Sequence, residues 1–154
     1  MKVVFDLDGT LADASRRVNQ YLICEKMGYP HKRTDGIDWE SFFLACDEDE
    51  PIEPTIAVLH ALYDQGHQVE IWTGRSDIAR EKTEQWLLTH GVPGSVIQTM
   101  RMRARNDRTN DDKLKLSWGE RFGMPDLVFE DRNRVVDMWR RHGVTVYHVA
   151  EGEF

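Results

Sequence analysis

The sequence contains no long hydrophobic run and only two cysteines. Nothing in its 154 residues approaches the run of about 18 apolar residues that a membrane helix needs, so no membrane span is expected. The stretch before Asp6 is too short for a secretory signal peptide. Cys24 and Cys46 lack CxxC spacing, which favours two reduced thiols, with a disulfide as the open alternative. These features predict a cytoplasmic protein.

Basic residues are also fewer than acidic residues. The chain has 20 Lys and Arg against 27 Asp and Glu, a net charge of −7, which argues against bulk electrostatic binding to nucleic acid. The net charge still allows a local basic site, because the arginines gather in two clusters. The first contains Arg101, Arg103, Arg105 and Arg108, and the second contains Arg132, Arg134, Arg140 and Arg141. The alternative is that these arginines are solvated or paired with the abundant acids. No GxxxxGK[ST] motif is present, so the sequence carries no P-loop kinase motif.

Short apolar segments alternate with amphipathic ones along the chain. Runs rich in Val, Ile and aromatic residues predict strands at 2–7, 68–74, 95–102, 126–131 and 144–149. Amphipathic segments that end at glycine predict helices at 54–66, 77–91 and 134–143. Strands that each follow a helix closely are typical of βαβ units and a mainly parallel sheet.

Residues 12–53 interrupt this alternation. The segment predicts a helix over 14–28, then a polar stretch with a short helical patch near Trp39–Leu44. Such an insertion is too small for an independent cap domain. With 40% hydrophobic and 31% charged residues and no repeat or linker, we expect one domain over residues 1–154.

Asp6 and Asp8 directly follow the first predicted strand, in "VVFDLDGT". Residues i and i+2 of a strand point to the same side, so both carboxylates can converge on one point. Ligands of open parallel sheets collect outside the carboxyl ends of the strands. Mg²⁺ there would relieve the repulsion between the carboxylates. An ordinary solvated turn is the alternative, but it does not account for DxDGT directly after a buried strand.

The segment "IWTGRS" ends the second predicted strand and carries Thr73, Gly74 and Arg75. Thr73 offers a hydroxyl, Gly74 allows the backbone to approach a ligand closely, and Arg75 can bind a phosphate bidentately. A plain strand-to-helix turn with Ser76 or Asp77 as N-cap accounts for those two residues but poorly for Thr-Gly-Arg.

Two later segments complete the candidate site. Lys113 and Lys115 lie near the start of a predicted helix, where a lysine can neutralise a phosphate. The equal alternative is that either lysine is simply solvated. Glu130 and Asp131 end the fourth predicted strand and can close a Mg²⁺ site with Asp6, unless they only cap the next helix. Four strand-end motifs in this order outweigh four separate coincidences.

The order Asp-Leu-Asp-Gly-Thr, Thr-Gly-Arg, Lys and Glu-Asp resembles the haloacid dehalogenase (HAD) superfamily of phosphotransferases. More narrowly, the stretches "ACDEDEPIEP", "RTNDDKLK" and "EDRNRVVDMWRRHGVTVYHVAEGEF" resemble the 3′-phosphatase domain of bacteriophage polynucleotide kinase-phosphatase. The resemblance spans nearly the whole chain. It implies a HAD-like Rossmannoid α/β fold, a three-layer sandwich with a mainly parallel central sheet and only a small cap insertion.

The resemblance also implies roles for individual residues. Asp6 would be the nucleophile and Asp8 the general acid–base, which requires Asp8 to be protonated at the start. Thr73 and Lys115 would hold the phosphate. Arg17, Arg75 and Asp111 match positions in or around the family's active site. Asp131 would bind Mg²⁺ together with Asp6, Asp8 and Glu130, which stands where the family leads us to expect an aspartate.

The expected function is Mg²⁺-dependent hydrolysis of a phosphomonoester through an aspartyl-phosphate. A small insertion leaves the site open, which favours a 3′-phosphate or 2′,3′-cyclic phosphate at a nucleic-acid end. A separate kinase or ligase that acts on the same ends is then a candidate partner. The alternative is a phosphatase acting on nucleotides or other small metabolites. A non-catalytic scaffold is disfavoured because Asp6, Asp8, Thr73, Lys115 and Asp131 are all present. The sequence does not indicate an oligomeric state.

Overall fold

The computed structural model of the chain describes residues 1–24, 29–30 and 38–152. Within these ranges, no helix has the length and apolar character needed to cross a membrane. Cys46 is a buried free thiol, whereas the side chain of Cys24 lies outside the described residues.

A central sheet of five parallel strands organises the fold, in the order β7-β6-β1-β8-β9. The strands are β1 (Lys2–Phe5), β6 (Gln68–Ser76), β7 (Arg101–Arg103), β8 (Leu127–Arg132) and β9 (Thr145–Gly152). Because β1 lies between β6 and β8, the segments that follow these three strands meet at one edge of the sheet. The predicted parallel α/β architecture is confirmed.

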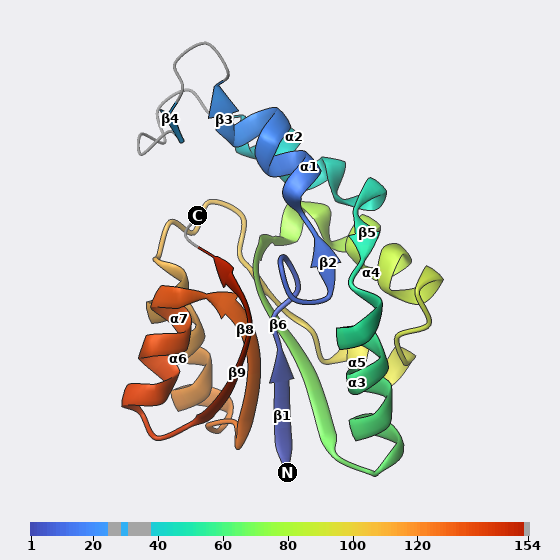
Figure 1. Cartoon of the computed structure of the whole chain (residues 1–154), viewed down its shortest axis with the longest axis vertical. Coiled ribbons are helices and arrows are strands. Elements are labelled where there is room, and N and C mark those ends of the chain that lie inside the picture. Colours follow the sequence, from blue (N-terminus) through green and yellow to red (C-terminus); the bar gives the residue numbers. More distant parts are fainter. Residues whose placement is uncertain (25–28, 31–37, 153–154) are drawn as a thin grey trace.

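Helices cover both faces of this sheet and make a three-layer sandwich (Figure 1). One layer contains α3 (Glu53–Asp64), α4 (Arg80–Thr89) and α5 (Gly94–Gln98), and the other contains α6 (Asp111–Phe122) and α7 (Asn133–Arg141). Successive residues of β1 serve opposite cores: Val3 and Phe5 pack with the α3–α5 layer, and Val4 packs with Trp139 of α7. This alternation is what a strand buried on both faces requires.

The predicted strand 95–102 is wrong in its first half. Residues Gly94–Gln98 form the helix α5, and β7 begins only at Arg101. Pro93 precedes the helix, and Val96 and Ile97 both enter the core beside α3 and α4. A short apolar run does not distinguish a buried helical turn from a strand, and here packing on the helical layer decides.

The insertion between β1 and α3 begins and ends at a small antiparallel pair. β2 (Ala12–Asp13) pairs with β5 (Glu50–Pro51), so the two ends of the predicted insertion lie side by side. The helix predicted over 14–28 is shorter: α1 (Ser15–Arg17) continues as a π-helical segment, Val18–Leu22, and Ile23–Cys24 (β3) pairs with Tyr29–Pro30 (β4). Residues 25–28 lie outside the described ranges. The predicted helical patch is α2 (Trp39–Leu44), followed by a 3₁₀ turn at Ala45–Glu48.

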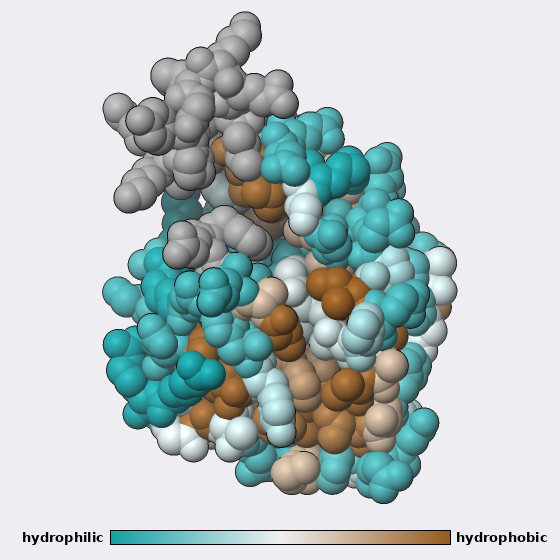
Figure 2. All heavy atoms as spheres, in the orientation of Figure 1, coloured by the Kyte–Doolittle hydropathy of each residue, from teal (hydrophilic) through white to brown (hydrophobic). Residues whose placement is uncertain are grey.

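The insertion sits above the carboxyl ends of the strands, while the N-terminus lies at the opposite end of the sheet (Figure 1). Hydrophilic residues cover the α7 side of the molecule, and apolar residues gather on the face between α7 and α3 (Figure 2). The exposed side of β9 contributes Tyr147, 58% exposed, which stacks on Phe129.

Candidate active site

Asp6 lies directly after β1 and is bonded to a lysine from a distant helix. Its backbone N–H donates to the carbonyl of Phe129 at 2.9 Å, which ties it to β8. Lys115 of α6 donates to Asp6 Oδ1 and to Glu130 Oε2, both at 2.6 Å. All three side chains are buried. Burial alone would lower the pKa of Lys115, but the charges of Asp6 and Glu130 outweigh it and raise that pKa, so the lysine stays cationic.

Three carboxylates crowd together at this point. Oxygens of Asp6, Glu130 and Asp131 lie within 4.8 Å of one another, and all three residues are buried. Burial, followed by the charge of Asp6, raises the pKa of both Glu130 and Asp131. Lys115 alone does not balance the negative charge. A divalent cation fits this donor set, because Mg²⁺ prefers carboxylate oxygens and would remove the excess charge.

Asp8 takes different partners from Asp6, since β1 ends at Phe5 and the chain turns away. Arg17 donates to Asp8 Oδ1 at 2.6 Å, and Arg75 donates to both oxygens of the same carboxylate. The expected role of the Asp8 carboxylate as a metal ligand together with Asp6 stays a prediction. The side chain of Asp8 is not part of the cluster that Asp6 forms with Glu130 and Asp131.

The surroundings of Asp8 favour its ionised form in the absence of substrate. Burial would raise the pKa of Asp8, but the charges of Arg75 and Arg17 outweigh it and hold that pKa well below its usual range. Asp8 is therefore ionised in this structure, whereas a general acid must begin protonated. Arg75, which the sequence analysis expects to bind a phosphate, contacts Asp8 and, at 3.0 Å, Thr83.

Two glycines permit close approach around these groups. Gly9 has φ +84°, and a Cβ at this position would collide with the carboxylate of Asp131. Gly74 would place a Cβ against the carboxylate of Asp111, the first residue of α6. The sequence interpretation assigned Gly74 to close approach of a ligand, and the structure adds close approach of Asp111. Neighbouring Thr73 is buried, and its Oγ1 accepts from the backbone N–H of Arg75 at 3.0 Å.

Asp111 organises arginines at the edge of the site. Its two carboxylate oxygens accept separately from Arg103 and Arg132. Arg103 also donates to the carbonyls of Gly74 at 2.9 Å and Thr109 at 2.5 Å. Arg103 therefore connects the end of β6 to the loop between β7 and α6, and it positions Asp111 rather than standing as a solvated cation.

Asp49 is a site residue that the sequence interpretation missed. It is 4% exposed and accepts from Arg17 at 2.6 Å through Oδ2, with Arg75 at 3.4 Å from the same oxygen. Asp49 thus holds the two arginines that hold Asp8. In the sequence it belongs to "CDEDE", where no local pattern distinguishes it from the neighbouring acids. Its neighbours Asp47 and Glu48 are indeed exposed, and the preceding hydrophobic Cys46 is the one local sign of a buried segment.

The two predicted arginine clusters contribute some of their members to one cavity. Arg101 points away from the site, where it lies 3.6 Å from Glu70 and over the ring of Phe122. Arg103, Arg105 and Arg108 line the cavity over the site, as do Arg132 and Arg134 of the second cluster. Lys113, the alternative to Lys115, is exposed on the outside of α6.

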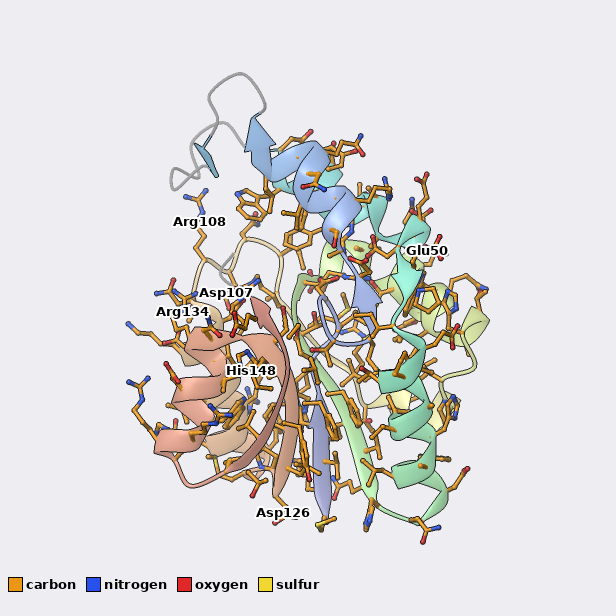
Figure 3. The ribbon with its side chains drawn as sticks, in the orientation of Figure 1. Glu50, Asp107, Arg108, Asp126, Arg134 and His148 are labelled. Atoms are coloured by element: carbon orange, nitrogen blue, oxygen red, sulfur yellow. The ribbon has the colours of Figure 1, made fainter. Side chains whose placement is uncertain are left out.

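A cavity of about 980 Å³ opens above these residues. We call Asp6, Asp8, Thr73, Lys115 and Glu130 its floor. One side is formed by α2 and the other by the loop after β7, from which Arg108 extends toward the insertion, with Arg134 below it at the start of α7 (Figure 3). A buried carboxylate next to a lysine, at the bottom of an open cavity lined by several arginines, can attack an anionic substrate.

Comparison with known proteins agrees with this geometry. A family model described as the phosphatase domain of polynucleotide kinase PNKP matches residues 38–154. A chain of the Pnkp1/Rnl/Hen1 RNA repair complex superposes with a TM-score of 0.73 at 28% identity, over 99% of this chain and 43% of that chain. The chain thus spans less than half the length of that relative.

More distant structures share the fold alone. A class C acid phosphatase from Bacillus anthracis with tungstate bound is 19% identical, with a TM-score of 0.61 over 87% of this chain and 52% of that chain. A predicted phosphatase from Clostridium acetobutylicum is 15% identical, with a TM-score of 0.63 over 94% of this chain and 82% of that chain. Both support the HAD-like architecture.

Proposed function

Because the chain belongs to the family of polynucleotide kinase PNKP phosphatase domains, we propose that it removes the 3′-phosphate from polynucleotide ends. The observation that carries the proposal is the pairing of Asp6 with Lys115 on the floor of an open cavity rich in arginine. We also propose that residues 1–154 form one phosphatase domain, with 12–53 as a small cap insertion.

In the proposed reaction, Asp6 attacks phosphorus and the bond between phosphorus and the 3′ oxygen breaks. Asp8 gives a proton to the leaving oxygen. Water then attacks the aspartyl-phosphate, Asp8 takes a proton from it, and inorganic phosphate leaves with Asp6 regenerated. Thr73 and Lys115 would hold the phosphoryl oxygens, with Gly74 allowing close approach and Lys115 balancing charge that builds up in the transition state.

Asp8 must gain its proton before it can act as an acid. Arg75 and Arg17 keep it ionised without substrate. An anionic phosphoryl group on the floor would share the charge of these arginines and add a negative charge beside Asp8. We therefore propose that Asp8 takes up its proton as substrate binds, with Arg17 and Arg75 sharing their charge between Asp8 and the phosphoryl group and Asp111 positioning its neighbours.

Asp6, Glu130 and Asp131 are the residues that would hold Mg²⁺ in this proposal. When bound, the ion would neutralise charge on the phosphoryl group. Glu130 has the longer side chain and also accepts from Lys115, so it can serve both cations.

The relative from an RNA repair complex makes a polynucleotide end the favoured substrate, and it makes separate kinase or ligase partners a reasonable expectation. The test is a comparison of kcat/KM for 3′-phosphate, 5′-phosphate and 2′,3′-cyclic phosphate ends on DNA and RNA oligonucleotides, with the 3′-mononucleotide alongside. We expect the 3′-phosphorylated oligonucleotide to be preferred. Equal values for oligonucleotide and mononucleotide would favour the small-metabolite alternative.

A further inference from the structure

The cavity has two chemically different sides above its floor. Trp39, Phe42 and Phe43 of α2 form one side, which we call the aromatic wall. Arg103, Arg105 and Arg108 form the opposite side, which we call the basic wall. Hydrolysis of a phosphomonoester needs only the floor, so both walls call for a separate explanation.

The aromatic wall contains one residue that packs inward and one that faces the cavity. Phe42 is 7% exposed and lies under the guanidinium of Arg17, at 4.6 Å from its ring centre. Trp39 is 37% exposed, stacks on Phe43 with ring centres 5.9 Å apart, and meets Phe42 edge-on at 5.6 Å. Because Arg17 contacts both Phe42 and Asp8, it fixes the position of the aromatic wall relative to the floor.

The basic wall gathers cations in a chain that is acidic as a whole. Arg103 fixes the loop through the carbonyls of Asp107 and Thr109, so that Arg105 and Arg108 are presented as exposed side chains. Arg105 lies 3.4 Å from Glu40 of α2, with 61% and 59% of these side chains exposed. This exposed pair bridges the two walls, and a phosphate can replace Glu40 as the partner of Arg105 at little cost.

An aromatic surface facing arginines is the arrangement that binds single nucleic-acid strands. Bases stack on aromatic rings, while cationic side chains follow the phosphates, and neither contact depends on the base sequence. A small phosphorylated metabolite without a ring would not stack on the aromatic wall.

Building on the proposed function, we propose that Trp39 stacks on the unpaired base of the 3′-terminal nucleotide, while Arg105 and Arg108 contact the phosphates that precede it. Trp39 thereby becomes a specificity-determining residue: the floor recognises the 3′-phosphate, and the aromatic wall recognises that a base is attached next to it.

The test is a cycle that changes the enzyme and the substrate separately. One DNA oligonucleotide carries a 3′-phosphate on an ordinary terminal nucleotide, and the other carries it on an abasic terminal sugar. Trp39→Ala and loss of the terminal base are each expected to lower kcat/KM by about 5- to 150-fold, the range for one stacked base. Together they should cost little more than either alone, because each removes the same contact.

Matched variants separate stacking from folding. Trp39→Phe retains a ring and should recover most of the loss on the base-bearing substrate. Phe122→Ala removes an aromatic residue of similar exposure, 40%, outside the cavity lining and should leave the preference for a terminal base unchanged.

Each outcome has a distinct meaning. If the losses from Trp39→Ala and from base removal multiply, Trp39 supports the fold and the stacking proposal is wrong. If the unmodified enzyme cleaves both oligonucleotides equally well, the terminal base is not bound and the proposal is again wrong, while the proposed function stands. Failure of the unmodified enzyme on every 3′-phosphorylated oligonucleotide would overturn the proposed function itself.

Discussion

The ion pairs on the floor of the cavity are buried, whereas the ion pair between its walls is exposed. On the floor, Lys115 and the carboxylates of Asp6 and Glu130 are almost entirely buried, and each charge is bonded to another. On the walls, Arg105 and Glu40 are more than half exposed and meet at 3.4 Å. Buried charges resist rearrangement because an unpaired one is costly, whereas exposed pairs exchange partners freely. The difference suggests a rigid centre for chemistry under a surface adapted to varied substrates.

The largest effect should come from the floor. Asp6→Asn removes the proposed nucleophile while keeping the size of the side chain, and we expect phosphatase activity to fall by on the order of 10⁴-fold or more. Single-turnover assays on a 3′-phosphorylated oligonucleotide measure this loss. Activity that survives the substitution would show that another group attacks phosphorus. The assignment of the chemical step to Asp6 on the floor would then be wrong.

Removal of divalent cations tests the crowding of carboxylates. Chelation should abolish activity, and added Mg²⁺ should restore it. Because burial and the charge of Asp6 raise the pKa of Glu130 and Asp131, the metal-free cluster holds protons near neutral pH that a bound cation expels. Calorimetry of Mg²⁺ binding in buffers of different ionisation enthalpy should therefore detect proton release, greatest below the raised pKa values and fading as the pH rises above them. Binding without proton release would contradict this charge arrangement.

Asp49 connects stability to the site. Asp49→Ala removes the carboxylate that accepts three hydrogen bonds from the buried Arg17, so we expect the free energy of unfolding to fall by about 3–5 kcal/mol, the usual cost of breaking a buried pair. Denaturant unfolding measures this change. Asp47→Ala is the matched control: Asp47 is 45% exposed on its side chain and pairs with Lys82, and its loss should cost about 1 kcal/mol or less. Equal costs would remove the distinction between buried and exposed pairs.

The smallest effect should come from the basic wall. Arg105→Ala is expected to leave catalysis intact and to reduce the slope of log affinity against log salt for a single-stranded oligonucleotide by about 0.7, the value for one lost phosphate contact. Arg80→Ala removes an arginine from another exposed pair, with Glu84, outside the cavity lining, and should not change the slope. An unchanged slope for Arg105→Ala would mean that this arginine does not contact phosphate.

The sequence predicted the helices and strands better than the interaction partners of the charged side chains. The βαβ alternation located β1, β6, β8 and β9, and hence the strand ends that carry Asp6, Thr73 and Glu130. It failed at 95–98, where an apolar run too short to show a period forms α5. It did not single out Asp49, and it left open whether Arg103 belongs to a basic site or pairs with an acid, because nothing local distinguishes a buried charge from a solvated one.

What the sequence determined by itself is the order of strands and helices and the identity of the side chains at the strand ends, since hydrophobic periodicity and glycine positions are local properties. Only the tertiary structure decided which charges meet. Lys115 reaches Asp6 across 109 positions, and Arg75 reaches Asp8 across 67. These pairings set the ionisation of Asp8 and leave Trp39 facing the basic wall, because burial and Coulomb energy depend on distances in space and not on distances along the chain.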